Sequence, residues 1–431
     1  MRPSKPDTPT DDLCRSSLEA ILDPEHELIR LAALIDWDRF DDAFGPYYHP
    51  GKGRRGLRTR LMAGLHMLKH MKGLSDEETC AAWLENPYFQ AFCGETHFQH
   101  RLRFDRSSLT RWRKRIGPGD LEALLAETIA VAIKTKAVSQ RQLERITVDT
   151  TVQTKAVAHP TDSHLLLRAI EWLNRAARRH GVKLRQSFIR LATRARREAS
   201  RLMHTRGHKQ GQRWVRKMRT WLGRLIRDIR RKIAGNADLE SAFKVALERA
   251  EKILGQQPGD KNKLYAMHAP EVECIGKGKA RTRYEFGVKT SIATTNERCK
   301  GGQFVLGTMA LPGNPYDGHT LAGQIDQVAK LTGVDVKRAY VDRGYRGHGI
   351  ERDELDITLS QTRGITSPTI RREMRRRNSI EPVIGHLKDD GHLERCHLVG
   401  PQGDAINAIL SAAGHNLRLL ARWLRELLLR I

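Results

Sequence analysis

The sequence predicts a mixed α/β domain that follows an all-helical N-terminal domain and is interrupted by a long, basic, all-helical insertion. Three observations support this fold class. The chain has 431 residues, enough for two or three domains with buried cores. Apolar residues recur with the spacing of an α-helix through residues 25–138 and again through 163–255. After Lys263 the apolar residues alternate with polar ones, which indicates strands.

The N-terminal part is expected to contain a tail and a helical DNA-binding domain. Residues 1–24 are rich in proline and aspartate, which predicts a loose tail. Residues 25–138 predict a series of helices. One of these helices begins at the capping box that Ser75 and Glu78 form.

One short helix of this domain is basic. It begins at Ser107 or Ser108 and ends at Gly117-Pro118. Either it is the last helix of a helix-turn-helix-like module that meets DNA, or it belongs to a plain helical packing module. In the first case the expected DNA contacts are Arg111, Arg113, Lys114 and Arg115.

The insertion carries most of the excess positive charge. The formal net charge is +26, and between Leu165 and Ile233 the sequence has 22 Lys and Arg residues against three acids. Such a block repels itself unless a polyanion is near, and each contact with a DNA phosphate releases a counterion. Helical spacing predicts three or four packed helices with arginines outside, so nucleic-acid contact is favoured over a merely solvated charged face. The candidate contacts are Arg213, Arg216 and Lys217.

Strand-like segments lie on both sides of the insertion. The run Glu144–Thr151 precedes it, and Thr282–Thr295 with Gln303–Gly313 predict a hairpin after it. If the first run pairs with the hairpin, one α/β domain spans residues 139–431 and the helical block at 163–255 is an insertion into it. The other expected elements are a helix near Thr320–Leu331, strands ending at Asp342 and Ser360, and helices at Thr369–Lys388 and Ala405–Leu429.

Three acids stand at positions that suit metal-dependent chemistry. Asp149 and Asp342 each end a predicted strand, where side chains of neighbouring strands meet at one sheet edge. Glu381 lies in a predicted helix, and Arg377 four residues before it and Lys388 seven after it share its face. Clustered carboxylates are the ligands that Mg²⁺ prefers, and paired Mg²⁺ ions serve phosphoryl transfer on nucleic acids. Each acid alone could instead be an ordinary turn, capping or salt-bridging residue.

Taken together, these segments resemble the DDE transposases of bacterial insertion sequences, in the insertion-sequence-five group. The similarity covers the helical N-terminal region, the ITVDTT strand, the run Tyr265–Lys279 leading into YEFGVKTSIATT, the VDRGYRG strand end and the IEPVIGHLK helix. It implies an RNase H-like catalytic domain with Asp149, Asp342 and Glu381 as the catalytic and metal-binding triad.

The segment around Glu381 also matches a family pattern. Arg377 and Lys388 stand at its arginine and lysine positions, where the resemblance implies contacts with DNA, and Met374 stands at its tyrosine position. We also expect Arg343, beside the second aspartate, to contact DNA.

The resemblance implies a transposase that binds insertion-sequence ends, cleaves DNA and joins the freed 3′-OH to target DNA. The implied cofactor is Mg²⁺, two ions per site, for which Mn²⁺ can substitute. The implied partners are double-stranded DNA and a second copy of the chain in the synaptic complex. Two alternatives remain open: an RNase H-like nuclease that cleaves without joining, and a catalytically inactive DNA-binding repressor.

Composition argues against several other classes of protein. The apolar runs are shorter than the ~18–20 residues that span a bilayer, and the N-terminus lacks an apolar leader. We therefore expect a bacterial cytoplasmic protein that associates with the nucleoid when bound to DNA. Six scattered cysteines without a C-x-x-C pair do not predict a zinc site or a disulfide framework.

Overall fold

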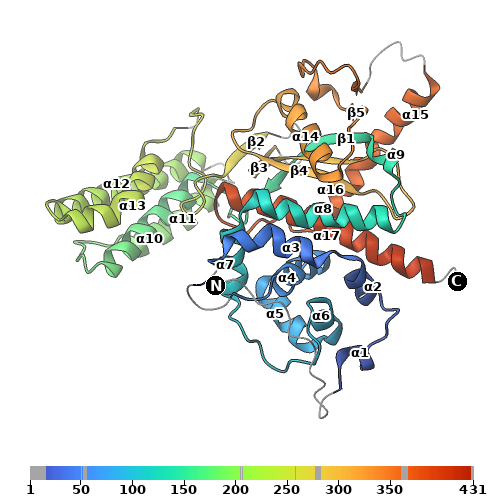
Figure 1. Cartoon of the computed structure of the whole chain (residues 1–431). Coiled ribbons are helices and arrows are strands. Elements are labelled where there is room, and N and C mark those ends of the chain that lie inside the picture. The colour runs from blue at the N-terminus through green and yellow to red at the C-terminus, as the bar shows by residue number, and fades with distance from the viewer. Residues whose placement is uncertain are drawn as a thin grey trace. The chain divides into compact units, whose positions relative to one another are not determined.

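The computed structural model (Figure 1) describes residues 16–49, 51, 56–203, 205, 207–257, 259–276, 283–360 and 367–428. The chain divides into two compact units. Residues Met1–Thr154 and Val288–Ile431 form one, here named the sheet unit. Residues Lys155–Gly287 form the other, here named the insert unit. The expected tail lies partly outside the described residues, which begin at position 16, and so does the 277–279 part of the Tyr265–Lys279 run.

Within the residues that the structure describes, the sheet unit begins with nine α-helices and one 3₁₀ turn. The capping box predicted at Ser75 and Glu78 is confirmed at the start of α5. The bounds are α1 Leu18–Ile21, α2 Glu27–Leu34, α3 Trp37–Phe44, η1 Gly45–Tyr47, α4 Thr59–Lys72, α5 Asp76–Glu85, α6 Pro87–Phe92, α7 Ser107–Ile116, α8 Pro118–Lys134 and α9 Gln140–Leu143.

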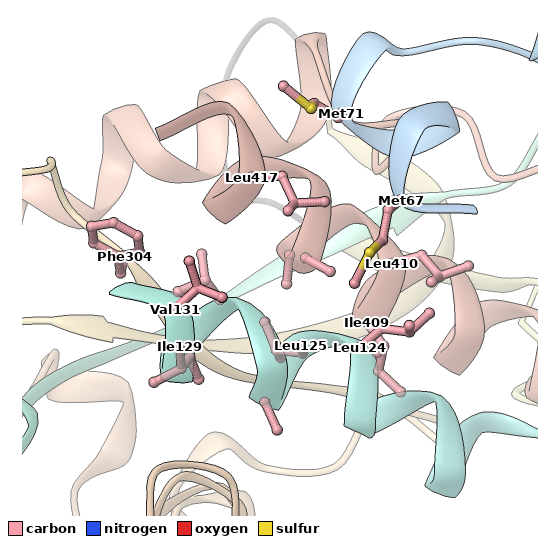
Figure 2. Close-up of a cluster of buried hydrophobic side chains, with 14 of the residues drawn as sticks. Met67, Met71, Leu124, Leu125, Ile129, Val131, Phe304, Ile409, Leu410 and Leu417 are labelled. Carbon is pink, nitrogen blue, oxygen red and sulfur yellow. The ribbon is translucent and has the colours of Figure 1, made fainter. Parts of the chain in front are cut away.

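These N-terminal helices share one core with the rest of the sheet unit. α4 and α8 both pack along the C-terminal helix α17 (Gly400–Leu428). Figure 2 shows their interlocking side chains, among them Met67, Leu125 and Leu410, which are at most 1% exposed. Burial of this size is the main stabilising term of the fold. The N-terminal helices and the sheet thus form a single unit, where the sequence predicted two domains.

A mixed sheet lies at the centre of the sheet unit. The predicted hairpin is confirmed, since β3 pairs antiparallel with β4. β1 pairs parallel with β5, which pairs parallel with β6, and β1 also neighbours β3. The first residues of β3 pair with β2 within the insert unit. The bounds are β1 Arg145–Thr154, β2 Glu273–Gly276, β3 Tyr284–Thr295, β4 Val305–Leu311, β5 Arg338–Val341 and β6 Asp356–Leu359.

Two sequence expectations about the elements that carry the acids are wrong. β1 continues to Thr154, so Asp149 lies inside the strand and not at its end. The helix expected over Thr369–Lys388 is two helices, because Pro382 lacks an N–H and its ring would clash with the carbonyl four residues earlier. The elements of this region are α14 Asp317–Thr332, η2 Arg343–Tyr345, α15 Pro368–Arg376, η3 Arg377–Ser379 and α16 Ile380–Asp389.

The insert unit is built from four helices packed around a core of their own (Figure 1). α10 packs against α11, α12 and α13, and α12 also packs against α11 and α13. Their bounds are α10 Asp162–Arg179, α11 Ile189–Met203, α12 His208–Ile233 and α13 Ala237–Gly255. In the part of the chain that the structure describes, no helix has both the length and the apolar character needed to cross a membrane.

Candidate active site

The register of two parallel strands brings Asp149 and Asp342 together. Arg145 pairs with Arg338, and the pairing advances residue by residue to Thr147 with Tyr340. Continuing this register by two residues places Asp149 opposite Asp342, just past the end of β5. Paired residues of parallel strands point to the same face, and the strands lie ~4.8 Å apart. The two carboxylates therefore share one position on the sheet, although Asp149 is in the middle of its strand.

Burial makes Asp149 an unusual carboxylate. It raises the pKa of Asp149 to about 6; the Thr150 N–H, 2.8 Å from Oδ1, opposes the rise, and the neighbouring Asp342 charge adds to it. The Arg377 guanidinium, 3.5 Å from Oδ2, favours the ionised form. Burial and a neighbouring carboxylate both disfavour the ionised form of Asp149. A cation bound between the two carboxylates would favour that form.

Asp342 has a well-defined local position. It is the N-cap of η2, and its Oδ1 accepts a hydrogen bond of 2.8 Å from the Gly344 N–H. This bond fixes the side chain at the point where β5 ends.

A third acid, Asp317, completes the cluster, and sequence reasoning missed it. It is the first residue of α14, and its Oδ1 accepts from Lys289 Nζ at 3.0 Å and from Thr150 Oγ1 at 3.3 Å. A Cβ built on Gly344 would lie 2.9 Å from Asp342 Oδ1 and 3.3 Å from Asp317 Oδ2. The two carboxylates thus leave no room for a side chain at position 344. In the sequence, Asp317 follows Asn314-Pro315, so it looks like an ordinary turn or helix-start residue.

Tyr345 lies under this cluster. It is fully buried, and its pKa is raised by burial and then by the charges of Asp149, Asp317 and Asp342. The phenol of Tyr345 therefore stays protonated. Each of the three carboxylates is therefore near enough to Tyr345 to act on the pKa of its phenol.

The Arg377 contact depends on a buried carboxylate one turn earlier. Glu373 in α15 is 2% exposed and accepts from Arg145 at 3.1 Å and Arg338 at 3.2 Å, the first residues of β1 and β5. This pairing ties the end of α15 to the two strands that carry the aspartates. Arg377 follows in η3 and reaches Asp149 from there.

Glu381 does not join the cluster in this conformation. It is exposed in the first turn of α16, one turn after Arg377, although α16 packs against β1. No hydrogen bond or ion pair of Glu381 is found within the described residues. Across those residues, no three His, Cys, Asp or Glu side chains are grouped so as to hold a metal ion. Lys388 lies two turns further along α16 on the face of Glu381, as predicted, whereas Arg377 is in the preceding 3₁₀ turn.

One predicted DNA contact lies in the interior. Arg113 is 3% exposed and makes two hydrogen bonds to the Asp76 carboxylate, at 2.9 and 2.6 Å. A guanidinium used in this way cannot reach a phosphate, so the prediction for Arg113 is wrong. The other predicted contacts outside the Glu381 helix are exposed: Arg111, Lys114, Arg115, Arg213, Arg216, Lys217 and Arg343.

Comparisons with known proteins decide which family this is. Residues 16–115 match a family model described as a transposase domain (DUF772), and residues 341–421 match a transposase DDE domain. Over 206 residues the chain is 53% identical to an uncharacterized protein, ORF8 in the nfe locus of Rhizobium meliloti. That stretch is 48% of this chain and 99% of the relative. The chain belongs to the DDE transposases. No solved structure matches this transposase.

The matched segments include part of the candidate site. The DDE domain match contains Asp342 and Glu381, and Asp149 precedes it. The DUF772 match contains α4, α5 and most of α7, and so includes Arg113 with its partner Asp76.

Proposed function

We propose that this transposase binds the ends of its own insertion sequence, cleaves DNA there and joins the freed 3′-OH to target DNA. The observation that carries the proposal is the register of β1 and β5, which brings Asp149 opposite Asp342 at a partly buried position. The parallel β1–β5 pair beside the antiparallel β3–β4 hairpin also supports an RNase H-like fold for the catalytic part.

Asp149 and Asp342 are the residues that would hold a divalent cation. Their carboxylate oxygens are hard ligands of the kind that Mg²⁺ and Mn²⁺ take. Burial raises the pKa of Asp149, and a bound cation would favour its ionised form. Bound Mg²⁺ supplies charge neutralisation for the phosphodiester and makes a water more acidic. By the family resemblance, Glu381 is the third ligand.

The other residues of the cluster orient the two aspartates. Asp317 holds the Thr150 hydroxyl and the Lys289 ammonium, so it fixes the strand segment next to Asp149. Arg377 contacts Asp149 and stands one turn before Glu381, where its guanidinium can pass to a DNA phosphate once the carboxylate has another partner. In-line displacement at phosphorus needs mainly such positioning and charge neutralisation.

The exposed cations on α7 and α12 are the proposed DNA contacts away from the site. Two protomers would be needed to act on both ends of one element, so we propose a homodimer on DNA. The proposed DNA partner is double-stranded, at the element ends and at the target.

The test is a cleavage assay with duplexes taken from the DNA that flanks the coding sequence. Wild-type protein with Mg²⁺ should release a defined 3′-OH, and a pre-cut end should be joined to a target plasmid. Asp342→Ala should remove both products and retain DNA binding, whereas Asp335→Ala, which changes an exposed acid before the start of β5, should leave them unchanged. Cleavage without joining would make the protein a nuclease, and binding without cleavage would make it a repressor.

A further inference from the structure

The insert unit contains a cleft whose charged lining residues are arginines with a single acid. It has a volume of about 820 Å³ and lies between the α10–α11 connection and the C-terminal half of α12. One acid, Asp228, is part of the same lining. The arginines that line it are Arg185, Arg224, Arg227, Arg230 and Arg231.

Three of these arginines form a row along α12. Arg224, Arg227 and Arg231 are exposed and are spaced by three and four residues, so they share one face of the helix. At 1.5 Å of rise per residue the row is ~10 Å long. Arg185 stands on the connection that forms the opposite wall.

The connection is held in place by hydrogen bonds to its backbone. Asp228, which is 8% exposed, accepts from the Arg185 N–H at 2.9 Å and from Lys232 Nζ at 2.8 Å. Lys232 Nζ also donates to the Lys183 carbonyl at 2.5 Å. At the other end of the connection, Asn174 donates to the Ser187 carbonyl at 2.9 Å. Arg185 is therefore fixed on its wall of the cleft.

The same connection contains a strained residue. Phe188 has φ of +58°, in the left-handed region that side chains other than glycine disfavour. Its ring is buried and stacks on Trp221 of α12, with ring centroids 6.2 Å apart. Strain of this kind persists only where surrounding contacts enforce it, and it concentrates at functional sites.

The gathered charges are only partly compensated by carboxylates. Arg230 pairs with Glu251, and Arg231 lies 3.6 Å from Asp228. Arg224 and Arg227 have no carboxylate partner within the described residues. A fold that brings like charges together with a strained backbone is stabilised by a polyanion that binds between them. A row of guanidiniums suits successive phosphates of one strand.

We propose that this cleft binds consecutive phosphates of a DNA backbone through Arg185, Arg224 and Arg227, and that Asp228 is a positioning residue for Arg185. The proposal rests on the DNA binding proposed above and assigns it to a site that differs from Arg213, Arg216 and Lys217. Phosphate contacts of this kind fix the position of a duplex and do not read its sequence.

The test compares two double variants of the full chain by fluorescence anisotropy with a duplex, across a series of KCl concentrations. Arg224→Gln with Arg227→Gln removes two contacts, so the slope of log K against log salt should fall by about 1.8, at 0.9 per contact. At 0.1 M salt this corresponds to roughly 60-fold weaker binding. The control, Lys244→Gln with Lys252→Gln, removes the same charge from exposed positions of α13 outside the cleft and should change the slope much less. Equal changes in both variants, or none in the first, would overturn the proposal.

Asp228 gives a test whose sign separates positioning from net charge. Asp228→Ala makes the protein more positive, which by itself favours DNA, yet it frees Arg185 and should weaken binding several-fold. Asp228→Asn keeps an acceptor for the Arg185 N–H and should restore most of the affinity. Tighter binding by Asp228→Ala would refute the positioning role, and if that variant does not fold, the arginine variants still decide the question.

Wild-type protein that binds no DNA at low salt would contradict the proposed function, whereas wild-type binding that the cleft variants leave unchanged would contradict the cleft alone.

Discussion

A single methyl group at Gly344 should displace Asp342, one of the two carboxylates on which the proposed chemistry depends. The Cβ of Gly344→Ala would lie 2.9 Å from Asp342 Oδ1 and 3.3 Å from Asp317 Oδ2. The first distance is shorter than real Cβ contacts, so the Asp342 carboxylate must move by about half an ångström to reach ordinary contact. The backbone of this residue is not in the left-handed region, so alanine adds no strain of its own.

The size of the effect follows from how precisely catalytic groups must be held. Sites of this kind require positions within ~0.5 Å, and a displacement of ~1 Å costs about 100-fold in rate. We therefore expect the cleavage rate of Gly344→Ala to fall by roughly 10- to 100-fold. The displaced atoms belong to the end of a side chain, so stability should change by less than about 1 kcal/mol.

The assay is metal-dependent cleavage of end DNA under single-turnover conditions, with anisotropy for DNA binding and thermal melting for folding. Gly385→Ala is the matched control, since a Cβ there meets nothing within 4 Å and the residue lies in α16, the helix of Glu381. The control should cleave at the wild-type rate. Cleavage by Gly344→Ala at the wild-type rate would refute the claim that Asp342 acts from its observed position.

Three other predictions come from the charges in the sheet unit. Asp76→Asn should destabilise the protein by about 3–5 kcal/mol in denaturant unfolding, because it leaves the buried cations Arg113 and Lys69 without their carboxylate; a change below 1 kcal/mol would contradict this. The metal-free protein should take up one proton near pH 6 as Asp149 protonates, because burial raises the pKa of Asp149 to about 6. A titration of the Asp149→Asn variant should lack this proton. Glu381→Ala should abolish cleavage and leave the DNA dissociation constant within twofold of wild type; retained metal-dependent cutting would reject its place in the triad.

The sequence predicted which strands surround the candidate site better than it predicted the geometry of the site. Alternating apolar residues located the hairpin and the strand before Asp342, and the register of β1 with β5 then placed Asp149 opposite that residue. The end of β1 was misplaced although Thr150 to Thr154 have ordinary strand character. Nothing in the run marks where pairing with β5 stops.

Two further differences have identifiable causes. Arg113 comes four residues after Leu109 and three before Ile116, so helical spacing already put it on the buried face of α7. Only its partner Asp76, on another helix, could not be foreseen. Asp317 was missed because its contacts, to Lys289 and Thr150, are made through the tertiary fold and leave no local pattern.

The most direct test of the account exchanges one oxygen ligand for sulfur. In Asp342→Cys the thiolate is a soft ligand that binds Mg²⁺ poorly and Mn²⁺ better. If Asp149 and Asp342 together hold the catalytic cation, this variant should be inactive with Mg²⁺ and should regain cleavage of end DNA with Mn²⁺. Cleavage by Asp342→Cys that is equal in both metals, or that persists in EDTA, would contradict the account.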